Sequence, residues 1–268
     1  MSLFQISVLA LVQGITEFLP ISSSGHLILV PAFTGWPDQG LLIDVAVHVG
    51  TLGAVVGYFS RDVAAMLRGL GDDWDGGLLA QPGRRLLAQL ALGTAPVIAV
   101  GCLLAAAEAT APLRSIAVIG WTTLIFGLLL YAADRWGPRT RRMEGMTFTG
   151  ALVIGASQVL ALVPGTSRSG ITMTAARMLG FEREDAARFS MLLAIPTIVA
   201  AGSLAVYEIH QLGQAELGAY AVLGAVLAFV SAWLTIALLM RWLQRASFTP
   251  FVVYRCALGL LLLAYAYG

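Results

Sequence analysis

Apolar residues run along the chain in stretches of about 20, separated by short polar segments. A helix needs about 20 mostly apolar residues to cross the hydrocarbon core of a bilayer. The pattern therefore predicts an all-α polytopic membrane protein. We expect full membrane-spanning helices near residues 42–60, 86–107, 115–133, 187–208, 217–240 and 250–267.

Two further apolar stretches, near 3–33 and 148–180, are interrupted at their centres by proline, glycine and serine. Proline removes a backbone donor and glycine favours positive φ, so a helix should break at both places. About 15 residues lie on either side of each break, which is too few to cross the bilayer alone. We predict two re-entrant hairpins, or spans broken at mid-depth.

The distribution of arginine predicts the orientation. Four segments carry most of the arginine residues, whereas the segments near 34–41, 108–114 and 209–216 hold only Arg114. The arginines of the four segments are Arg61, Arg68, Arg84 and Arg85; Arg135, Arg139, Arg141 and Arg142; Arg177, Arg183 and Arg188; and Arg241 and Arg245. The positive-inside rule places the four arginine-rich loops in the cytoplasm. The first hairpin then enters from the outer side and the second from the cytoplasm, with both termini outside. The alternative is that one hairpin crosses fully and reverses the orientation of the later spans.

The composition agrees with a bilayer environment, since 58% of residues are hydrophobic and 12% are charged, against roughly 25% charged in soluble domains. A net charge of +1 does not favour binding to nucleic acid. The chain has no lysine, which excludes any mechanism that needs one. Cys102 and Cys256 lie in apolar segments, so we expect small buried residues rather than a disulfide or zinc site. The first arginine is Arg61, so we expect no cleavable signal peptide.

The two interrupted stretches resemble each other. Gln13 and Gln158 each precede a serine motif by nine residues, and Ser22-Ser23-Ser24-Gly25 aligns with Ser167-Arg168-Ser169-Gly170 at the same offset of 145. With hairpins that enter from opposite faces, this predicts an inverted-topology repeat of residues 1–145 and 146–268, each with one hairpin and three spans. Functional sites of such proteins lie where the broken helices meet near the middle of the membrane.

Ionisable groups inside apolar spans are costly and are therefore candidates for function. The first hairpin holds Glu17 and His26, with Gln13 one helical turn before Glu17 and on the same face. The second hairpin holds Arg168, which needs an anion: either Glu17 or a bound phosphate. A Glu17–Arg168 pair could also be purely structural, and some serines could serve only as helix caps.

The two breaks supply groups that suit a phosphate. A guanidinium offers a planar fork of donors, and broken helix ends add hydroxyl and backbone donors. A hydroxyl nucleophile needs a base, which Glu17 or His26 could supply. This set favours phosphoryl transfer on a phosphate carried by a lipid. The expected substrate contacts are Gln13, Ser22, Ser24, Gly25, Gly165, Thr166, Ser167, Ser169 and Gly170, with His48 near the site.

Two motifs in this order resemble a known family, the undecaprenyl-diphosphate phosphatases of the bacitracin-resistance type. They are QGITEFLPISSSGH at residues 13–26 and PGTSRSG at residues 164–170, and residues 48–52 and 188–196 are also similar to the family. The resemblance spans nearly the whole chain. It implies hydrolysis of undecaprenyl diphosphate to the monophosphate and inorganic phosphate at the outer face of the bacterial plasma membrane. This activity recycles the lipid carrier for peptidoglycan synthesis and confers bacitracin resistance.

By motif position, the resemblance implies that Glu17, Ser23, His26 and Arg168 are catalytic. Arg168 would clamp the diphosphate, and Ser23 is the favoured nucleophile or orienting hydroxyl. His26 would protonate the leaving group or attack phosphorus. Glu17 would act as a base or, together with Gln13, hold a divalent cation, Mg²⁺ or Ca²⁺. Gln13 replaces a glutamate that many members carry, so we expect the substrate's phosphates to bridge the cation.

A second interpretation from another class is a secondary transporter or lipid flippase, because inverted repeats with broken helices are typical of transporters. A type-2 phosphatidic acid phosphatase is excluded, because that superfamily begins with a lysine-bearing motif. The expected partners are a prenyl diphosphate lipid and the membrane. The sequence leaves open the nucleophile, the metal, the prenyl chain length, a homodimer and any additional flippase role.

Overall fold

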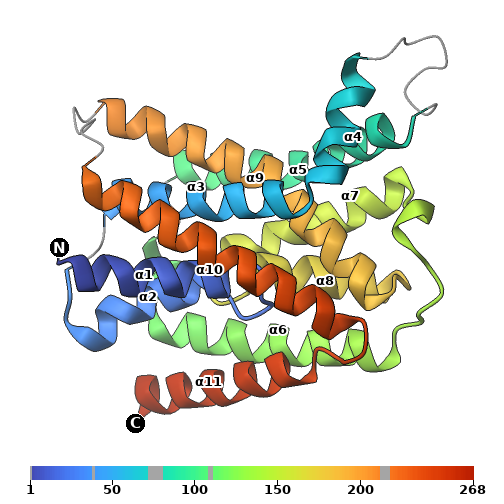
Figure 1. Ribbon diagram of the computed structural model, residues 1–268. Coiled ribbons are helices and arrows are strands. Elements are labelled where there is room, and N and C mark those ends of the chain that lie inside the picture. The colour runs from blue at the N-terminus through green and yellow to red at the C-terminus, as the bar shows by residue number, and fades with distance from the viewer. Residues whose placement is uncertain (1, 38–39, 72–80, 108–110, 212–217) are drawn as a thin grey trace.

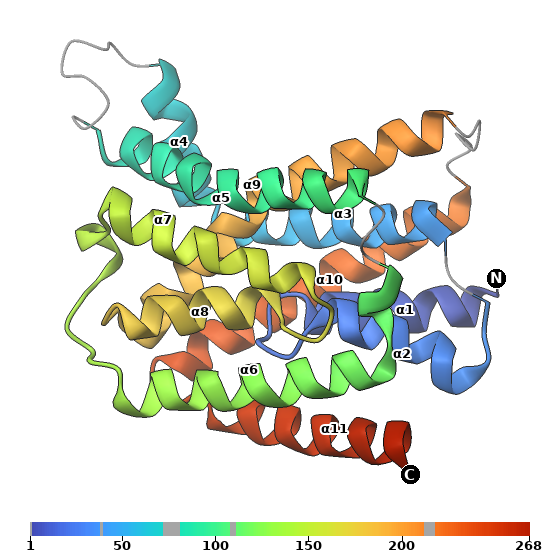
Figure 2. The same cartoon turned by 180° about the vertical axis from the view of Figure 1, so that it is seen from behind.

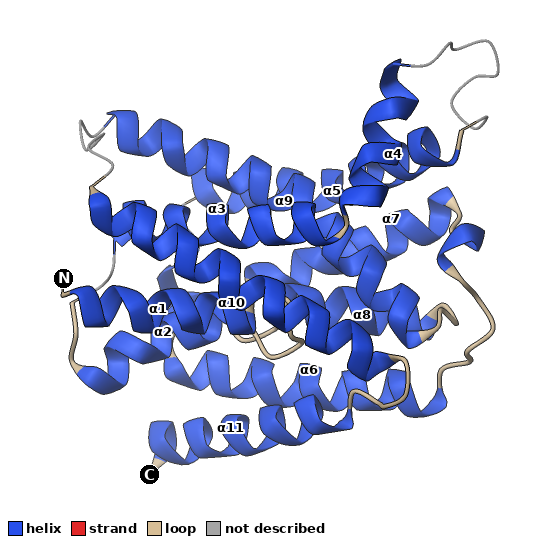
Figure 3. Cartoon of the chain, in the orientation of Figure 1, coloured by secondary structure: helices blue, strands red, loops and turns tan. Residues whose placement is uncertain are grey.

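The computed structural model describes residues 2–37, 40–71, 81–107, 111–211 and 218–268. These residues form helices and their connections, with no β-strand among them (Figures 1 and 3). In chain order the helices are α1 (Leu3–Thr16), α2 (Ser23–Thr34), α3 (Gly40–Tyr58), α4 (Ser60–Gly71), α5 (Pro82–Ala106), η1 (Ala111–Arg114), α6 (Ile116–Trp136), η2 (Met143–Gly145), α7 (Phe148–Ser157), η3 (Gln158–Leu162), α8 (Arg168–Met178), α9 (Arg183–Gln211), α10 (Ala219–Leu243) and α11 (Thr249–Tyr267).

Six of the described helices are long and apolar enough to cross a membrane. They are α3, α5, α6, α9, α10 and α11, with spans at Gly40–Tyr58, Pro82–Ala106, Ile116–Trp136, Arg183–Tyr207, Ala219–Leu243 and Thr249–Tyr267. Each lies within a few residues of a span predicted from the sequence. The prediction of six full spans is confirmed.

The outer surface of these helices is apolar. Leu103, Leu238 and Leu261 are each more than 60% exposed, which a water-soluble protein would avoid on this scale and which contact with lipid explains. The two cysteines are free thiols, of which Cys102 is exposed and Cys256 is only half-buried. The expectation that both are buried was wrong, because an apolar position on a membrane helix can face lipid instead of the protein interior.

Two hairpins complete the fold. The first consists of α1 and α2 and folds back at residues 17–22, here called the first tip; the second consists of α7, η3 and α8 and folds back at residues 163–167, the second tip. The 14-residue helix α1 rises only about 21 Å, less than a bilayer core. In Figure 1 the first hairpin begins and ends on the left, with both chain termini, and the second begins and ends on the right. Figure 2 shows the same arrangement from behind. The hairpins therefore enter from opposite ends, as predicted.

The two tips meet inside the molecule. Figure 3 shows their loops in the interior of the helical bundle. The Ser169 hydroxyl donates a hydrogen bond of 2.8 Å to the Leu19 carbonyl. Ser22 and Ser167 precede the returning helices at φ 76° and 72°, and they are the two non-glycine residues with positive φ in the described chain. This shared geometry agrees with a repeat, although the boundary between residues 145 and 146 stays a prediction.

The arginine-rich segment 61–85, predicted to be a loop, contains a helix. Arg61 and Arg68 lie on α4, which is 12 residues long and strongly amphipathic. A search for membrane-length apolar stretches passes over such a helix, because its apolar residues cover only one face. Arg84, at the start of α5, fixes α4 by donating from Nε to the Gly69 carbonyl at 2.8 Å.

A buried ionic cluster joins the helices at the base of the second hairpin. The Asp134 carboxylate at the end of α6 accepts from Arg183 at 2.6 and 2.8 Å and from Arg177 Nε at 3.3 Å. It also accepts from the Phe248 amide at 3.2 Å. Asp134 and Arg177 are buried, and their pairing offsets the free-energy cost of removing each charge from water. The cluster holds α8 and α9 in a fixed position relative to α6.

Candidate active site

Glu17 and Arg168, which come from different hairpins, form an ion pair. Glu17 follows the last residue of α1, and Arg168 is the first residue of α8. The Arg168 Nη2 atom donates to Glu17 Oε1 at 2.7 Å, and the two side chains are only 17% and 6% exposed. Each charge is costly to bury alone, so the pairing explains how both are held between the tips.

The second carboxylate oxygen of Glu17 is also engaged. Its Oε2 atom accepts from the Ser23 hydroxyl at 2.6 Å and from the Gln13 amide at 2.9 Å. The shorter distance is typical of a hydroxyl bound to an ionised carboxylate. Ser23 is therefore a hydroxyl in direct contact with a base, and Gln13 and Arg168 fix the orientation of that base.

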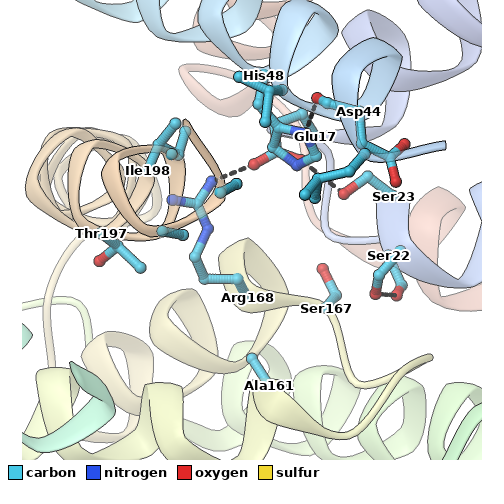
Figure 4. A pocket seen from close by; sticks show the side chains of 16 residues that line it. Glu17, Ser22, Ser23, Asp44, His48, Ala161, Ser167, Arg168, Thr197 and Ile198 are labelled. Atoms are coloured by element: carbon cyan, nitrogen blue, oxygen red, sulfur yellow. Dashed lines mark hydrogen bonds and ion pairs between the residues drawn. The ribbon is translucent and has the colours of Figure 1, made fainter. Parts of the chain in front are cut away.

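A cavity of about 320 Å³ lies beside this pair. Its lining residues are Glu17, Ser22, Ser23, Ser24, Leu41, Asp44, Val45, His48, Ala161, Ser167, Arg168, Thr197, Ile198, Ala201, Gly202 and Ala205. Figure 4 shows Arg168 directed toward Glu17, with His48 and Asp44 of α3 on one side of the pair and Thr197 and Ile198 of α9 on another. The wall is polar at the tips and apolar along α9. A ligand with an anionic head and an apolar chain matches this division.

Arg168 has a donor to spare for an anion. Its Nη1 atom is buried and has no hydrogen-bond partner among the described residues, and the same holds for the Thr166 hydroxyl. Buried donors without partners are rare in proteins and call for an explanation. A phosphate oxygen would satisfy the guanidinium, and the N-terminus of α8, where Arg168 lies, favours negative charge.

His26 lies elsewhere. It is absent from the lining of the cavity. Its Nδ1 atom is 2.6 Å from the Ser22 carbonyl, and its Nε2 atom is 2.6 Å from the hydroxyl of Tyr254 on α11. The two rings stack, with centroids 5.7 Å apart. Both ring nitrogens are thus engaged within the protein, and the structure does not bring His26 into the cavity with Glu17 and Arg168.

Two ionisable residues of α3 line the cavity. His48 does so, in the neighbourhood expected from the sequence, and its Nδ1 atom is 2.7 Å from the Asp44 carbonyl. The Asp44 side chain also lines the cavity, although it was not among the site residues predicted from the sequence. The signal was present, because Asp44 is an acidic residue within a predicted span, and the rule that singled out Glu17 applies to it equally.

The remaining motif residues divide into two groups. Ser22, Ser24 and Ser167 line the cavity, whereas Gln13, Gly25, Gly165, Thr166, Ser169 and Gly170 are not in its wall. The second group lies in the second tip or in the helical turns that flank the two tips. Gly165, at φ 89°, has a structural role: a Cβ there would lie 2.7 Å from the Ile119 carbonyl of α6, so only glycine allows this approach.

The site residues do not by themselves form a divalent-cation site. Among the described residues, no three His, Cys, Asp or Glu side chains group so as to hold a metal ion. Glu17 already accepts from Arg168, Ser23 and Gln13. A cation would compete with the guanidinium for this one carboxylate, so the protein alone offers a poor set of ligands.

Comparison with known proteins agrees with this geometry. A family model described as bacitracin resistance protein BacA matches residues 6–261. Proteins named undecaprenyl-diphosphatase from Ruegeria pomeroyi and Dinoroseobacter shibae are 53% and 52% identical over 268 residues, with 100% of both chains covered. One from Chromohalobacter salexigens is 51% identical over 260 residues, which is 96% of each chain. The family resemblance seen in the motifs is thereby confirmed, and the chain belongs to the bacitracin resistance protein BacA family.

Proposed function

We propose that this protein hydrolyses undecaprenyl diphosphate to undecaprenyl phosphate and inorganic phosphate. The names of the full-length relatives support the substrate. The observation that carries the proposal is the Glu17 carboxylate, which binds the Ser23 hydroxyl with one oxygen and the Arg168 guanidinium with the other. A base, a hydroxyl and an anion clamp are thus in contact in the polar part of the wall of a cavity whose α9 side is largely apolar.

The chemistry follows from these contacts. The terminal phosphate binds the free Nη1 donor of Arg168, which stabilises the charge that develops on its oxygens. Glu17 takes the proton of Ser23, and the Ser23 oxygen attacks the terminal phosphorus. The bond from that phosphorus to the bridging oxygen breaks, and undecaprenyl phosphate leaves. A water molecule then hydrolyses the phosphoserine, which releases inorganic phosphate and restores the hydroxyl.

The catalytic role of His26 stays a prediction. Its contacts with Ser22 and Tyr254 favour a different task, which is to hold the first turn of α2 against α11. Since Ser23 lies in that turn, His26 would fix the direction of the nucleophile. Direct protonation of the leaving group would require the ring to leave both partners.

The divalent cation also stays a prediction from the family resemblance. If Mg²⁺ or Ca²⁺ takes part, it would enter with the diphosphate, whose oxygens would supply most of the ligands. Its chemistry would be to neutralise charge on the two phosphates. Asp44 of α3 lines the same cavity and offers an additional carboxylate in its wall.

We further propose that the protein lies in the bacterial inner membrane with the cavity open to the outer face. The arginine-rich segments lie on α4 and at or beside those ends of α5, α6, α8, α9 and α10 that point toward the right of Figure 1. The cavity is lined by the first half of α3 and the second half of α9, which lie toward the left, with the termini. The positive-inside rule then places the cavity toward the outer face. A homodimer stays a prediction.

Phosphate release by the detergent-purified protein tests the proposal. The parent should release phosphate from undecaprenyl diphosphate, and Arg168→Ala and Glu17→Ala should abolish release while remaining folded. The comparisons give no support to a transporter. A folded parent without activity on any prenyl diphosphate would return that alternative to first place.

A further inference from the structure

Arg255 on α11 is a buried arginine without an acidic partner among the described residues. Its side chain is 0% exposed. Within that part of the chain its guanidinium donates only to backbone carbonyls. A buried guanidinium is costly, so one that is neutralised only by carbonyl dipoles needs a specific explanation.

Three of the carbonyls that Arg255 binds belong to the two hairpin tips. Its Nη1 atom donates to the Pro20 carbonyl in the first tip at 3.1 Å. Its Nη2 atom donates to the carbonyls of Gly165 and Thr166 in the second tip at 3.0 and 2.9 Å. Its Nε atom donates to the Thr123 carbonyl of α6 at 3.0 Å. One rigid group therefore joins the two tips to each other and to the helix beneath them.

These contacts lie close in sequence to the proposed catalytic groups. Pro20 lies between Glu17 and Ser23, and Thr166 lies two residues before Arg168. We propose that Arg255 is a positioning residue, which sets the separation between the Glu17–Ser23 pair on one hairpin and Arg168 on the other. This inference rests on the proposed phosphatase function.

The surrounding glycines make room for this arrangement. A Cβ on Gly170, in the second motif, would lie 2.8 Å from Arg255 Nη1, and a Cβ on Gly127 of α6 would lie 3.0 Å from Arg255 Cβ. The space that Arg255 needs thus explains why the second motif has glycine at position 170. No contact between Gly170 and the substrate is needed to explain it.

Lysine cannot replace arginine in this task. The guanidinium offers five donors in a fixed plane, so it can bind carbonyls on two loops at once. A lysine keeps the positive charge but presents a single flexible ammonium group, which cannot hold both tips at a fixed separation. Arg255→Lys therefore separates a geometric role from a purely electrostatic one.

The experiment measures kcat and KM for phosphate release by the folded fraction of Arg255→Lys in detergent. We expect kcat to fall at least about 30-fold, because small misplacements of reacting groups carry large rate penalties. We expect KM to change less than about 3-fold, because Arg168 still binds the phosphate. The matched control is Arg177→Lys, since Arg177 is equally buried and binds the carbonyls of Gly137 and Pro138 far from the tips. It should lose thermal stability yet keep kcat.

A second pair of variants covers the case in which Arg255→Lys does not fold. Gly127→Ala presses on the Arg255 stem, whereas Gly101→Ala on α5 meets only Leu162 at an ordinary 3.7 Å. We expect kcat to fall in Gly127→Ala and to stay unchanged in Gly101→Ala.

Three results are decisive. A kcat within 2-fold of the parent in Arg255→Lys, or in Gly127→Ala where the lysine variant does not fold, overturns the positioning role. An equal fall of kcat in Arg177→Lys overturns it as well, because the loss would then reflect general loosening. An inactive parent is a separate result, which contradicts the proposed function itself and removes the basis of this inference.

Discussion

Ser22 and Ser167 occupy matching positions at the two hairpin tips. Each accepts a hydrogen bond from the amide of the glycine three residues on, at 3.3 and 3.0 Å. Each hydroxyl also lies near that of the serine two residues on, at 3.3 and 3.2 Å. Positive φ at a non-glycine residue costs about 1–3 kcal/mol, and residues strained in this way cluster at functional sites. The same strained cap thus precedes Ser23 in the first hairpin and Arg168 in the second.

The contact between Ser23 and Glu17 predicts that Ser23→Ala lowers kcat about 1,000-fold or more, since it removes the nucleophile. Ser24→Ala is the matched control, because Ser24 lines the same cavity but contacts only the Ser22 hydroxyl among the hydrogen bonds of the site. Acid-quenched parent protein should carry phosphate on Ser23 by mass spectrometry. Phosphate release by Ser23→Ala at more than a tenth of the parent rate would instead make Ser23 an orienting group for water.

The position of His26 predicts that His26→Gln and Tyr254→Phe lower kcat by similar factors, of about 10 or less, because each loosens the same contact. Neither change should alter the alkaline limb of the pH–rate profile. The measurement is kcat from pH 6 to about 10 for both variants and the parent. A limb that flattens in His26→Gln alone would show that the histidine donates the proton to the leaving group.

The contact between Gln13 and Glu17 predicts that a substitution at Gln13 changes the concentration of divalent cation that activity requires. Gln13→Glu places a second carboxylate beside Glu17, since Gln13 Nε2 is 2.9 Å from Glu17 Oε2. Two adjacent carboxylates repel each other and attract a cation. We expect the variant to need several-fold less Mg²⁺ or Ca²⁺ for half-maximal activity, and to lose thermal stability in EDTA.

Gln158→Glu is the control for that measurement, because Gln158 is the buried counterpart of Gln13 in the second hairpin. It should lose stability without any change in the cation requirement. An unchanged cation requirement in Gln13→Glu would show that Glu17 and its neighbour do not face the metal.

The buried Asp134 cluster predicts a large effect on stability. Asp134→Asn leaves Arg177 and Arg183 without their carboxylate and should destabilise the fold by about 3–5 kcal/mol. Glu182→Gln is the control, since its pair with Arg142 is 42% and 73% exposed and such pairs contribute about 0–1 kcal/mol. Thermal unfolding in detergent measures both. Equal melting temperatures would mean that the cluster contributes nothing beyond packing.

Much of the architecture could be predicted from the sequence, because it depends on length and composition. Twenty apolar residues define a span, and a proline–glycine–serine interruption defines a break. The contact between the two hairpins could also be predicted, because Glu17 and Arg168 carry opposite charges in apolar surroundings and each needs a partner.

The remaining features depend on which way a side chain points around its helix. His26 follows the serine motif by only two residues, yet it faces α11 and not the cavity. Arg255 lies in an apolar span without any nearby motif, and its role became visible only through the carbonyls that it binds. Hydrophobicity that is nearly uniform around a membrane helix gives no period from which such directions could be read.

A double-mutant cycle on Glu17 and Arg168 tests most directly whether the two hairpins form one phosphatase site. The measurement is kcat/KM for phosphate release from undecaprenyl diphosphate by Glu17→Gln, Arg168→Gln and the double variant. Residues that act as a unit are not additive. We predict that each single change costs about 1,000-fold and that the double variant is no worse than the poorer single one. Losses that multiply, or single variants that keep more than half of the parent activity, would contradict a shared site.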